Sequence, residues 1–253
     1  MNILITGATA GFGLDIARRF ARDGHRIVLV GRRRERLDAL VAELGDAAHA
    51  VTLDVRDRAA VVAAIAGLPD AFAATDVLVN NAGLALGSAP AQAASLDDWH
   101  TMVDTNVKGL MTVTHAVLPG MVARNRGHVI NLGSVAGRWP YPGGNVYGAT
   151  KAFVRQFSLN LRADLTGTRV RVTDIEPGLV AGTEFSEVRF AGDTARAADV
   201  YKDTEALTAA DVSDAVHWVA TRPAHVNVNT LELMPVCQSF GGTTISRNLK
   251  PSG

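Results

Sequence analysis

Short runs of aliphatic and β-branched residues alternate with longer stretches of helical period along most of the chain. This alternation is typical of repeated βαβ units, in which helices cover both faces of a parallel sheet. The strands are expected near 2–6, 26–30, 48–53, 76–80, 128–133, 169–175 and 228–233. The helices are expected near 12–23, 34–44, 57–66, 97–124, 147–165 and 209–221. The pattern therefore predicts an α/β fold, a doubly wound parallel sheet of about seven strands.

No linker or internal repeat divides the chain, so residues 1–253 are expected to form one domain. Two segments interrupt the alternation. Residues 135–146 contain too much Gly and Pro for a helix or strand and predict a shaped loop before a helix. Residues 178–207 form a long connection after the sixth strand. Because open α/β sheets bind ligands at the carboxyl ends of their strands, this connection is a candidate lid.

The charge and cysteine content exclude several classes of function. Lys plus Arg and Asp plus Glu each number 25, so no net charge favours nucleic acid or an anionic membrane. The single cysteine, Cys237, excludes an intrachain disulfide and is expected to be a small buried hydrophobe. We see no signal peptide and no apolar run of about 18 residues, so we expect a cytoplasmic protein without a membrane span. The seven histidines lack metal-binding spacing, so no metal is expected.

Three glycines lie where the first strand turns into a helix, in the sequence T-G-A-T-A-G-F-G at 6–13. Glycines at such a turn let backbone amides approach a pyrophosphate at the positive end of the helix dipole. The candidate cofactor-binding residues of this loop are Gly7, Thr9, Ala10, Gly11, Phe12 and Gly13. The alternative is a tight turn without a ligand. The strand-turn-helix context favours a dinucleotide loop in a Rossmann-type fold.

The second strand ends in Gly31, followed by the run Arg32, Arg33 and Arg34. No Asp or Glu is present there to hold the ribose hydroxyls of NAD. The dipole at a helix start disfavours cations, so these arginines indicate a nearby anion such as a 2′-phosphate. The alternative is a solvated helix start with Glu35 as a partial counter-charge. The sequence therefore predicts NADP as the cofactor.

Two further strand ends carry candidate cofactor contacts. Asp54 and Val55 follow the third strand, where Asp54 either accepts a hydrogen bond from an adenine amino group or caps the next helix. After the fourth strand, Asn81, Ala82 and Gly83 form a turn of small residues that permits the close approach of a flat group.

Tyr147 and Lys151 lie four residues apart, adjacent on one helical face. A nearby cation stabilises a phenolate, so Lys151 together with an oxidised nicotinamide is expected to lower the pKa of Tyr147. Ser134 closes the fifth strand, at the sheet edge where Tyr147 begins its helix. Both hydroxyls are therefore expected to meet one substrate oxygen. Asn106 is an amide in an apolar helix, which either holds a water linked to Lys151 or caps a bent turn.

These motifs, taken in order, resemble the short-chain dehydrogenase/reductase family over essentially the full chain. The resemblance implies a catalytic tetrad of Asn106, Ser134, Tyr147 and Lys151. It also implies that the segment after the sixth strand contacts the nicotinamide through Pro177, Gly178, Val180 and Thr183. The chain departs from many NADP-using relatives at Ala10, where those carry a basic residue. The phosphate assignment therefore rests on Arg32 and Arg33.

Residues 82–87, 139–147 and 176–185 resemble more closely the NADP-dependent 3-hydroxy acid dehydrogenases. That resemblance implies oxidation of the β-hydroxyl of serine, allo-threonine or 3-hydroxypropionate-like acids, and reduction of malonic semialdehyde. A carboxylate substrate needs a cation, which either Arg138 or Arg189 could provide. Each of these is otherwise an ordinary surface arginine.

Other interpretations remain open at this point. The enzyme could reduce another carbonyl substrate, or it could be a nucleotide-sugar epimerase or dehydratase, although no added C-terminal substrate domain is visible. A non-catalytic NADPH-binding sensor is the alternative outside enzymes. The family resemblance also implies a homotetramer, and the long helical stretches 97–124 and 147–165 could pair between subunits.

Overall fold

The computed structural model describes residues 1–241, so the last residues of the expected domain, 242–253, lie outside the described range. Seven strands in these residues form one parallel sheet with the order β3-β2-β1-β4-β5-β6-β7. The strands are β1 (Asn2–Thr6), β2 (Arg26–Gly31), β3 (Ala48–Thr52), β4 (Val77–Asn80), β5 (Gly127–Leu132), β6 (Val170–Pro177) and β7 (Thr230–Leu233). The expected doubly wound sheet is confirmed.

Helices follow most of the strands and cover the sheet. The α-helices are α1 (Gly11–Arg22), α2 (Arg34–Leu44), α3 (Arg58–Ala66), α4 (Asp70–Ala73), α5 (Leu96–Val103), α6 (Leu110–Ala123), α7 (Asn145–Asp164), α8 (Phe185–Arg189), α9 (Thr194–Asp199) and α10 (Ala209–Ala220). Short 3₁₀ turns occur at Gly45–Ala47, Ala91–Ala93 and Val135–Gly137. Within residues 1–241, no helix is long and apolar enough to cross a membrane.

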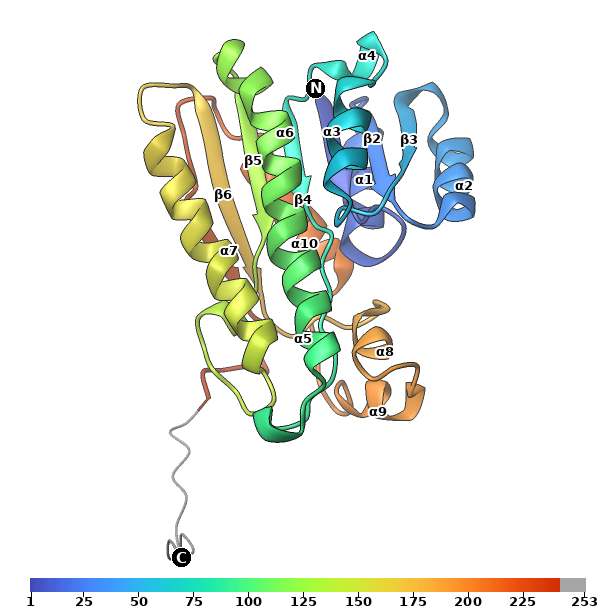
Figure 1. Cartoon of the computed structure of the whole chain (residues 1–253), viewed down its shortest axis with the longest axis vertical. Helices are drawn as coiled ribbons and strands as arrows, with labels where there is room; N and C mark the ends of the chain where they lie inside the picture. The colour runs from blue at the N-terminus through green and yellow to red at the C-terminus, as the bar shows by residue number, and fades with distance from the viewer. Residues whose placement is uncertain (242–253) are drawn as a thin grey trace, which may run out of the picture.

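The helices form a layer on each face of the sheet (Figure 1). In β1, Ile3 and Ile5 face the core under α1, α2 and α10, while Leu4 faces the core under α3, α4, α6 and α7. All three side chains are fully buried. Burial on both faces explains why the strands read as continuous apolar runs rather than as alternating ones.

The sheet order reverses beside β1, because the chain moves outward to β3 and then returns to β4 on the other side of β1. At such a switch point, the connections after the two central strands diverge and leave a crevice at their carboxyl ends. In Figure 1, helices α5, α8 and α9 lie beyond this edge of the sheet. Helices α8 and α9 belong to the segment 178–207, which we call the lid segment.

The helix expected over 97–124 is not uniform. Its first part is α5, capped by Ser95, whose hydroxyl accepts a hydrogen bond from the amide of Asp98 at 3.2 Å. A π-helical turn, Asp104–Gly109, then joins α5 to α6. Turns of this kind are rare inside helices and occur often at functional sites. Asn106 lies within the π-helical turn, so the bend that the sequence left open as an alternative is present.

The expectation that Cys237 is buried is wrong. The chain leaves the edge strand β7 at Leu233, and Cys237 lies in the exposed segment beyond it. Its thiol faces the carbonyl oxygen of Glu205 at 3.3 Å. Strand β7 also begins two residues later than expected, at Thr230. Strand β7 is an edge strand and pairs only with β6, so no further strand shields the residues that follow it from solvent.

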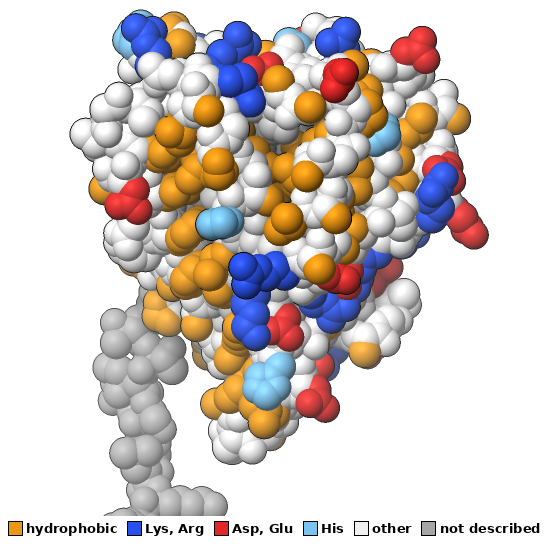
Figure 2. Space-filling model, turned by 45° about the horizontal axis from the view of Figure 1, so that its top comes forward, with side chains coloured by type: hydrophobic (Ala, Val, Ile, Leu, Met, Phe, Trp, Pro, Cys, Tyr) orange, Lys and Arg blue, Asp and Glu red, His pale blue; other side chains and the backbone are white. Residues whose placement is uncertain are grey.

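Apolar side chains gather on the outer face of α6 and α7, the two long helices at the front of Figure 1. Met111 and Val122 of α6 are 42% and 39% exposed. On α7, the rings of Phe153 and Phe157 stack with their centroids 5.7 Å apart. Figure 2 shows hydrophobic side chains over these front helices. A grouped apolar surface of this kind indicates a contact with another molecule.

His128 is a buried histidine at the amino end of β5, and its burial makes the stability of the fold depend on pH. Its Nε2 atom lies 2.7 Å from Thr173 Oγ1, and burial holds its pKa well below the ordinary 6.5. The folded protein therefore keeps His128 neutral, while the unfolded chain takes up a proton below about pH 6.5. We expect the free energy of unfolding to fall with decreasing pH by up to about 1.4 kcal/mol per unit from this group.

His128→Gln should flatten that slope between about pH 6.5 and 5, as measured by denaturant unfolding at fixed protein concentration. His115→Gln, on an exposed position, is the control and should keep the wild-type slope. An unchanged slope in His128→Gln would show that this histidine is protonated in the folded state.

Candidate active site

The glycine loop between β1 and α1 has the shape that a dinucleotide requires. Gly7 and Gly11 adopt positive φ angles of 69° and 51°, which L side chains rarely adopt. A Cβ atom at Gly13 would overlap the carbonyl oxygen of Gly7. From the loop after β4, Asn81 Nδ2 donates hydrogen bonds to the carbonyl oxygens of Thr6 and Gly7 at 2.8 and 3.1 Å. No acidic residue occupies the first turn of α1, so its amino end can accept an anion.

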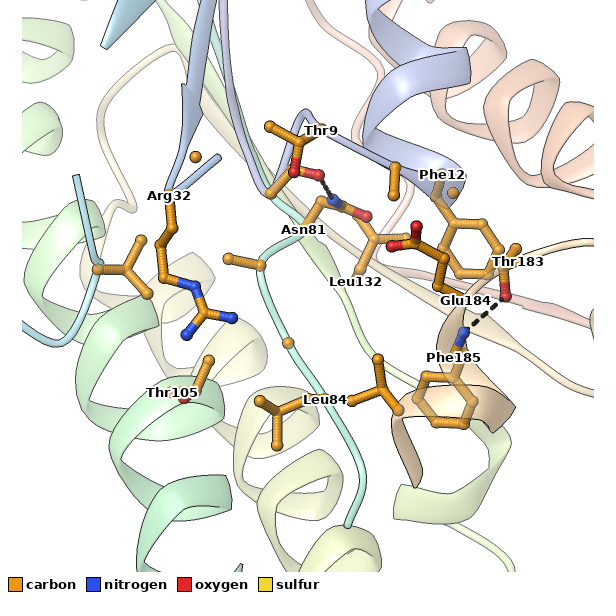
Figure 3. Close-up of a pocket in the computed structure, with 18 of the residues that line it drawn as sticks. Thr9, Phe12, Arg32, Asn81, Leu84, Thr105, Leu132, Thr183, Glu184 and Phe185 are labelled. Atoms are coloured by element: carbon orange, nitrogen blue, oxygen red, sulfur yellow. Dashed lines mark hydrogen bonds between the residues drawn. The ribbon is translucent and has the colours of Figure 1, made fainter. Parts of the chain in front are cut away.

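A groove with a cavity volume of about 310 Å³ runs along the carboxyl edge of the sheet (Figure 3). Most of the residues expected to bind the cofactor line it. They are Gly7, Thr9, Ala10, Gly11, Phe12, Arg32, Arg33, Asp54, Val55, Asn81, Ala82, Gly83, Tyr147, Lys151 and Thr183. These residues come from the segments that follow six of the strands, β1 to β6, so they meet at the carboxyl edge of the sheet.

Other expected cofactor residues lie next to the groove without lining it. Gly13 packs beneath the glycine loop, and Pro177 accepts a long hydrogen bond, 3.4 Å, from Ser134 Oγ. Gly178 packs so closely against Gln238 that a Cβ atom would overlap its amide oxygen. Val180 is buried and forms a bridge with Leu207 within the lid segment. Contacts of these residues with a cofactor stay a prediction.

The two candidate phosphate ligands have different surroundings. Arg32 is 64% exposed, and its nearest carboxylate oxygen, on Asp54, is 3.9 Å away. Figure 3 shows Arg32 at one side of the groove. Arg33 donates from Nε and Nη2 to Thr9 Oγ1 and from Nη1 to Glu184 at 2.7 Å. Arg32 therefore has more hydrogen-bond donors free for an incoming anion.

Asp54 does not cap the helix that follows it. That helix, α3, is capped by Asp57, which accepts a hydrogen bond from the amide of Ala60. Asp54 instead accepts hydrogen bonds from the amide and guanidinium of Arg56, which hold the pKa of Asp54 below its ordinary value. The capping alternative is thus wrong. A contact of Asp54 with an adenine amino group stays a prediction.

The structure brings Ser134, Tyr147 and Lys151 together at one end of the groove. Ser134 follows β5, and its side chain is near enough to the phenol of Tyr147, in the first turn of α7, to lower the pKa of that phenol. Lys151, one turn further along α7, donates from Nζ to the carbonyl oxygen of Leu132 at 2.7 Å. Its Nζ atom lies 5.9 Å from the centroid of the Tyr147 ring. The arrangement places two hydroxyls and one cation around a single point.

Without a cofactor, the pKa of Tyr147 is raised. Burial raises the pKa of Tyr147 above 10, and Ser134 only partly opposes this. Burial also lowers the pKa of Lys151 to about 8, against the attraction of Asp174. For the protein's own residues, desolvation outweighs the charges around the phenol. The expected lowering of the pKa by Lys151 together with an oxidised nicotinamide stays a prediction.

Asn106 uses its side chain to position the loop after β4. Its Oδ1 atom accepts from the amide of Leu84 at 2.9 Å, and its Nδ2 atom donates to the carbonyl oxygen of Leu84 and to Thr150 Oγ1. A Cβ atom at Gly83 would lie 3.3 Å from Asn106 Oδ1 and 3.6 Å from Lys151 Nζ. Asn106 and Lys151 therefore approach the same point of the loop.

The two candidate substrate arginines also differ. Arg138 forms ion pairs with the buried Glu176 at 2.8 Å and with Glu232 at 3.3 Å. Its charge is thus used to compensate a buried carboxylate. Arg189 donates to the carbonyl oxygen of Gly87 at 3.0 Å, and its charge is near enough to oppose the rise in the Tyr147 pKa. Of the two arginines, Arg189 is the one whose charge acts on the Tyr147 phenol, so it is the better candidate to bind a substrate carboxylate there.

The sequence did not point to several groove residues, including Glu184, Phe185 and Thr105. Phe185 packs edge-on against Tyr147, with ring centroids 5.7 Å apart. Glu184 bonds to arginines about 150 positions earlier in the chain. The only sequence signal was the spacing of Arg33 and Arg36, which are three residues apart and can therefore contact the same carboxylate. Within the described residues, no group of three or more His, Cys, Asp or Glu could hold a metal ion.

A family model described as short chain dehydrogenase matches residues 1–193. The chain belongs to the short-chain dehydrogenase family. A relative from Salmonella typhi, named NADP-dependent 3-hydroxy acid dehydrogenase YdfG, is 64% identical over 248 residues, covering 98% of this chain and all of that protein. A serine 3-dehydrogenase from Rhizobium radiobacter is 56% identical over 246 residues, covering 97% of this chain and 98% of the relative.

Solved structures of short-chain dehydrogenases share the whole fold. One, titled as the closed form of serine dehydrogenase complexed with NADP⁺, has a TM-score of 0.97 at 64% identity, covering 98% of this chain and all of that one. The serine dehydrogenase from Escherichia coli has a TM-score of 0.85 at 60% identity, covering 95% of this chain and all of that one. The resemblance drawn from the sequence motifs is therefore confirmed.

Arg32→Ala tests the phosphate end of the groove. We expect it to weaken NADPH binding by about 1–3 kcal/mol, the contribution of a charge-assisted hydrogen bond, while NADH binding changes little. Fluorescence titration with both cofactors measures the difference. Arg34→Ala is the control, because Arg34 pairs with Asp38 at 2.7 Å and does not line the groove. Equal losses for NADPH and NADH would remove Arg32 from phosphate recognition.

Proposed function

We propose that this protein is an oxidoreductase that transfers a hydride between NADP(H) and the 3-hydroxy or 3-oxo group of a small acid. Serine, allo-threonine, 3-hydroxypropionate and malonic semialdehyde are the substrates of this type. The observation that carries the proposal is that Tyr147 and Lys151 line one end of a groove that fits a dinucleotide, with Ser134 beside the phenol of Tyr147.

The residues at this end of the groove are suited to move a proton at the substrate oxygen. NADP(H), when bound, supplies or accepts the hydride. In the direction of reduction, Tyr147 Oη donates its proton to the carbonyl oxygen, and Ser134 Oγ donates a hydrogen bond to the same atom. The raised pKa of Tyr147 keeps the phenol protonated at neutral pH. Lys151 provides the positive charge that stabilises the phenolate once the proton has left.

The similar proteins support both the cofactor and the substrate class. The Salmonella typhi relative is NADP-dependent and acts on 3-hydroxy acids by its name, and the Rhizobium radiobacter relative acts on serine by its name. In this chain, the free donors of Arg32 and the lack of an acid after β2 fit a 2′-phosphate. Arg189, beside Tyr147, fits a substrate carboxylate.

We further propose that the lid segment, residues 178–207, covers the bound substrate, since Thr183, Phe185 and Val188 of this segment line the groove.

For the assembly we propose a homotetramer, supported by the apolar outer face of α6 and α7 (Figure 2). A location in the cytoplasm remains a prediction from the sequence.

A kinetic screen of 3-hydroxy acids with NADP⁺ and NAD⁺, followed by nicotinamide absorbance, tests the proposal directly. We expect turnover with at least one small 3-hydroxy acid and a clear preference for NADP⁺. Turnover only with substrates that lack a carboxylate would favour a reductase for another carbonyl. NADPH binding without turnover of any substrate would favour a sensor.

Tyr147→Phe removes the hydroxyl and keeps the ring. Because general acid–base catalysis contributes about 10²–10⁴-fold, we expect kcat to fall by at least about 10²-fold. The Kd for NADPH, measured by fluorescence, should change little, since the ring still packs against Phe185. A kcat near that of the wild type would exclude Tyr147 as the proton donor.

Arg189→Gln tests the substrate end of the groove. We expect KM for a 3-hydroxy acid to rise about 10- to 100-fold, as for the loss of a hydrogen bond between charged groups, with no change in the Kd for NADPH. Arg196→Gln is the control on the neighbouring helix, since Arg196 bonds to Ser88 and, unlike Arg189, does not affect the pKa of Tyr147. If KM is unchanged in Arg189→Gln, the substrate carboxylate is bound elsewhere.

A further inference from the structure

Glu184 joins the two sides of the cofactor groove. Its Oε2 atom accepts a hydrogen bond from Arg33 at 2.7 Å, and its Oε1 atom accepts one from Arg36 at 2.6 Å. Both arginines lie at the start of α2, whereas Glu184 lies in the lid segment, immediately before α8. Glu184 and Arg33 both line the groove, and Arg36 does not. In Figure 3, Glu184 and Phe185 lie across the groove from Arg32.

The bridge also includes the glycine loop. Arg33 donates twice to Thr9 Oγ1, at 3.1 and 2.9 Å, so one guanidinium contacts both the glycine loop and the lid segment. A guanidinium has five N–H donors, of which Arg33 uses three here, so two remain for an anion. Although burial opposes it, the hydrogen bonds from Arg33 and Arg36 hold the pKa of Glu184 below its ordinary value. The bridge is therefore ionic at neutral pH.

The residue after Glu184 reaches the reacting end of the groove. Phe185 packs edge-on against the Tyr147 ring at 5.7 Å, with an angle of 60° between the rings. The backbone amide of Phe185 also donates a hydrogen bond to Thr183 Oγ1 at 3.3 Å. Two consecutive residues thus contact the arginines at the phosphate end and the phenol at the other end. A change in the position of Glu184 must move Phe185 as well.

We propose that Glu184 is a positioning residue that holds the lid segment over the cofactor, so that the cofactor leaves only after the bridge to Arg33 and Arg36 breaks. This inference rests on the proposed binding of NADP(H) in the groove. It assigns to Glu184 the control of the rate of cofactor release, which is separate from the proton chemistry at Tyr147.

The test measures the release of NADPH from the full-length protein by stopped-flow fluorescence, with excess NADP⁺ as the competitor. Glu184→Gln keeps the size of the side chain and removes its charge. The two pairs are partly exposed, so we expect release to become about three- to tenfold faster. High salt should accelerate release from the wild type and have less effect on Glu184→Gln.

Arg36→Gln separates the bridge from direct contact with the cofactor. Because Arg36 does not line the groove, faster release in this variant must result from the loss of its bond to Glu184. The double variant should release NADPH no faster than the faster single variant. Glu187→Gln, an exposed carboxylate on α8, is the matched control and should release NADPH at the wild-type rate.

Wild-type release rates in Glu184→Gln would overturn the proposal. So would additive effects of Glu184→Gln and Arg36→Gln, because independent effects exclude a shared bridge. The measurement uses no hydroxy acid, so its outcome is independent of the substrate assignment. If the wild type does not bind NADPH at all, the proposed function fails first, and that result is distinct from unchanged release in the variant.

Discussion

The buried ammonium of Lys151 is the constraint on which the site depends. A charge inside a protein is costly, and burial lowers the pKa of Lys151 to about 8. Its Nζ atom donates to the carbonyl oxygen of Leu132 at the end of β5, and Asp174 on β6 partly opposes the effect of burial on this pKa. Two neighbouring strands of the sheet therefore fix where the ammonium lies. Gly83 passes close to both groups, since a Cβ atom there would lie 3.3 Å from Asn106 Oδ1 and 3.6 Å from Nζ.

Once the ammonium is fixed, the other groups follow from the connections around it. Tyr147 lies one helical turn before Lys151, so the phenol is directed to the same end of the groove. Ser134 follows β5 by two residues and lies near enough to that phenol to lower its pKa. Asn106, through its two hydrogen bonds to Leu84, holds the loop that contains Gly83. Tyr147 and Lys151 are thus placed by α7, and Ser134 directly follows β5, which favours a constant geometry of the proposed catalytic groups.

The sequence was informative wherever the cause was local. Apolar runs predicted the strands, and Gly7 predicted the strand-to-helix turn because its positive φ angle favours glycine. Prediction failed where distant segments decide the outcome. The bond from Arg33 to Glu184 depends on how the lid segment folds back. The exposure of Cys237 depends on the lack of a strand beside β7 other than β6 within residues 1–241.

The central claim is that burial keeps Tyr147 protonated in the protein alone, and that a cationic neighbour in the groove is needed to release its proton. Ultraviolet difference titration of the wild type against Tyr147→Phe measures the tyrosinate of this one residue. In the protein alone, we predict no tyrosinate from Tyr147 below about pH 10, its ordinary pKa. With NADP⁺ added, we predict that it titrates at lower pH. Tyrosinate from Tyr147 near neutral pH without the cofactor would contradict the account.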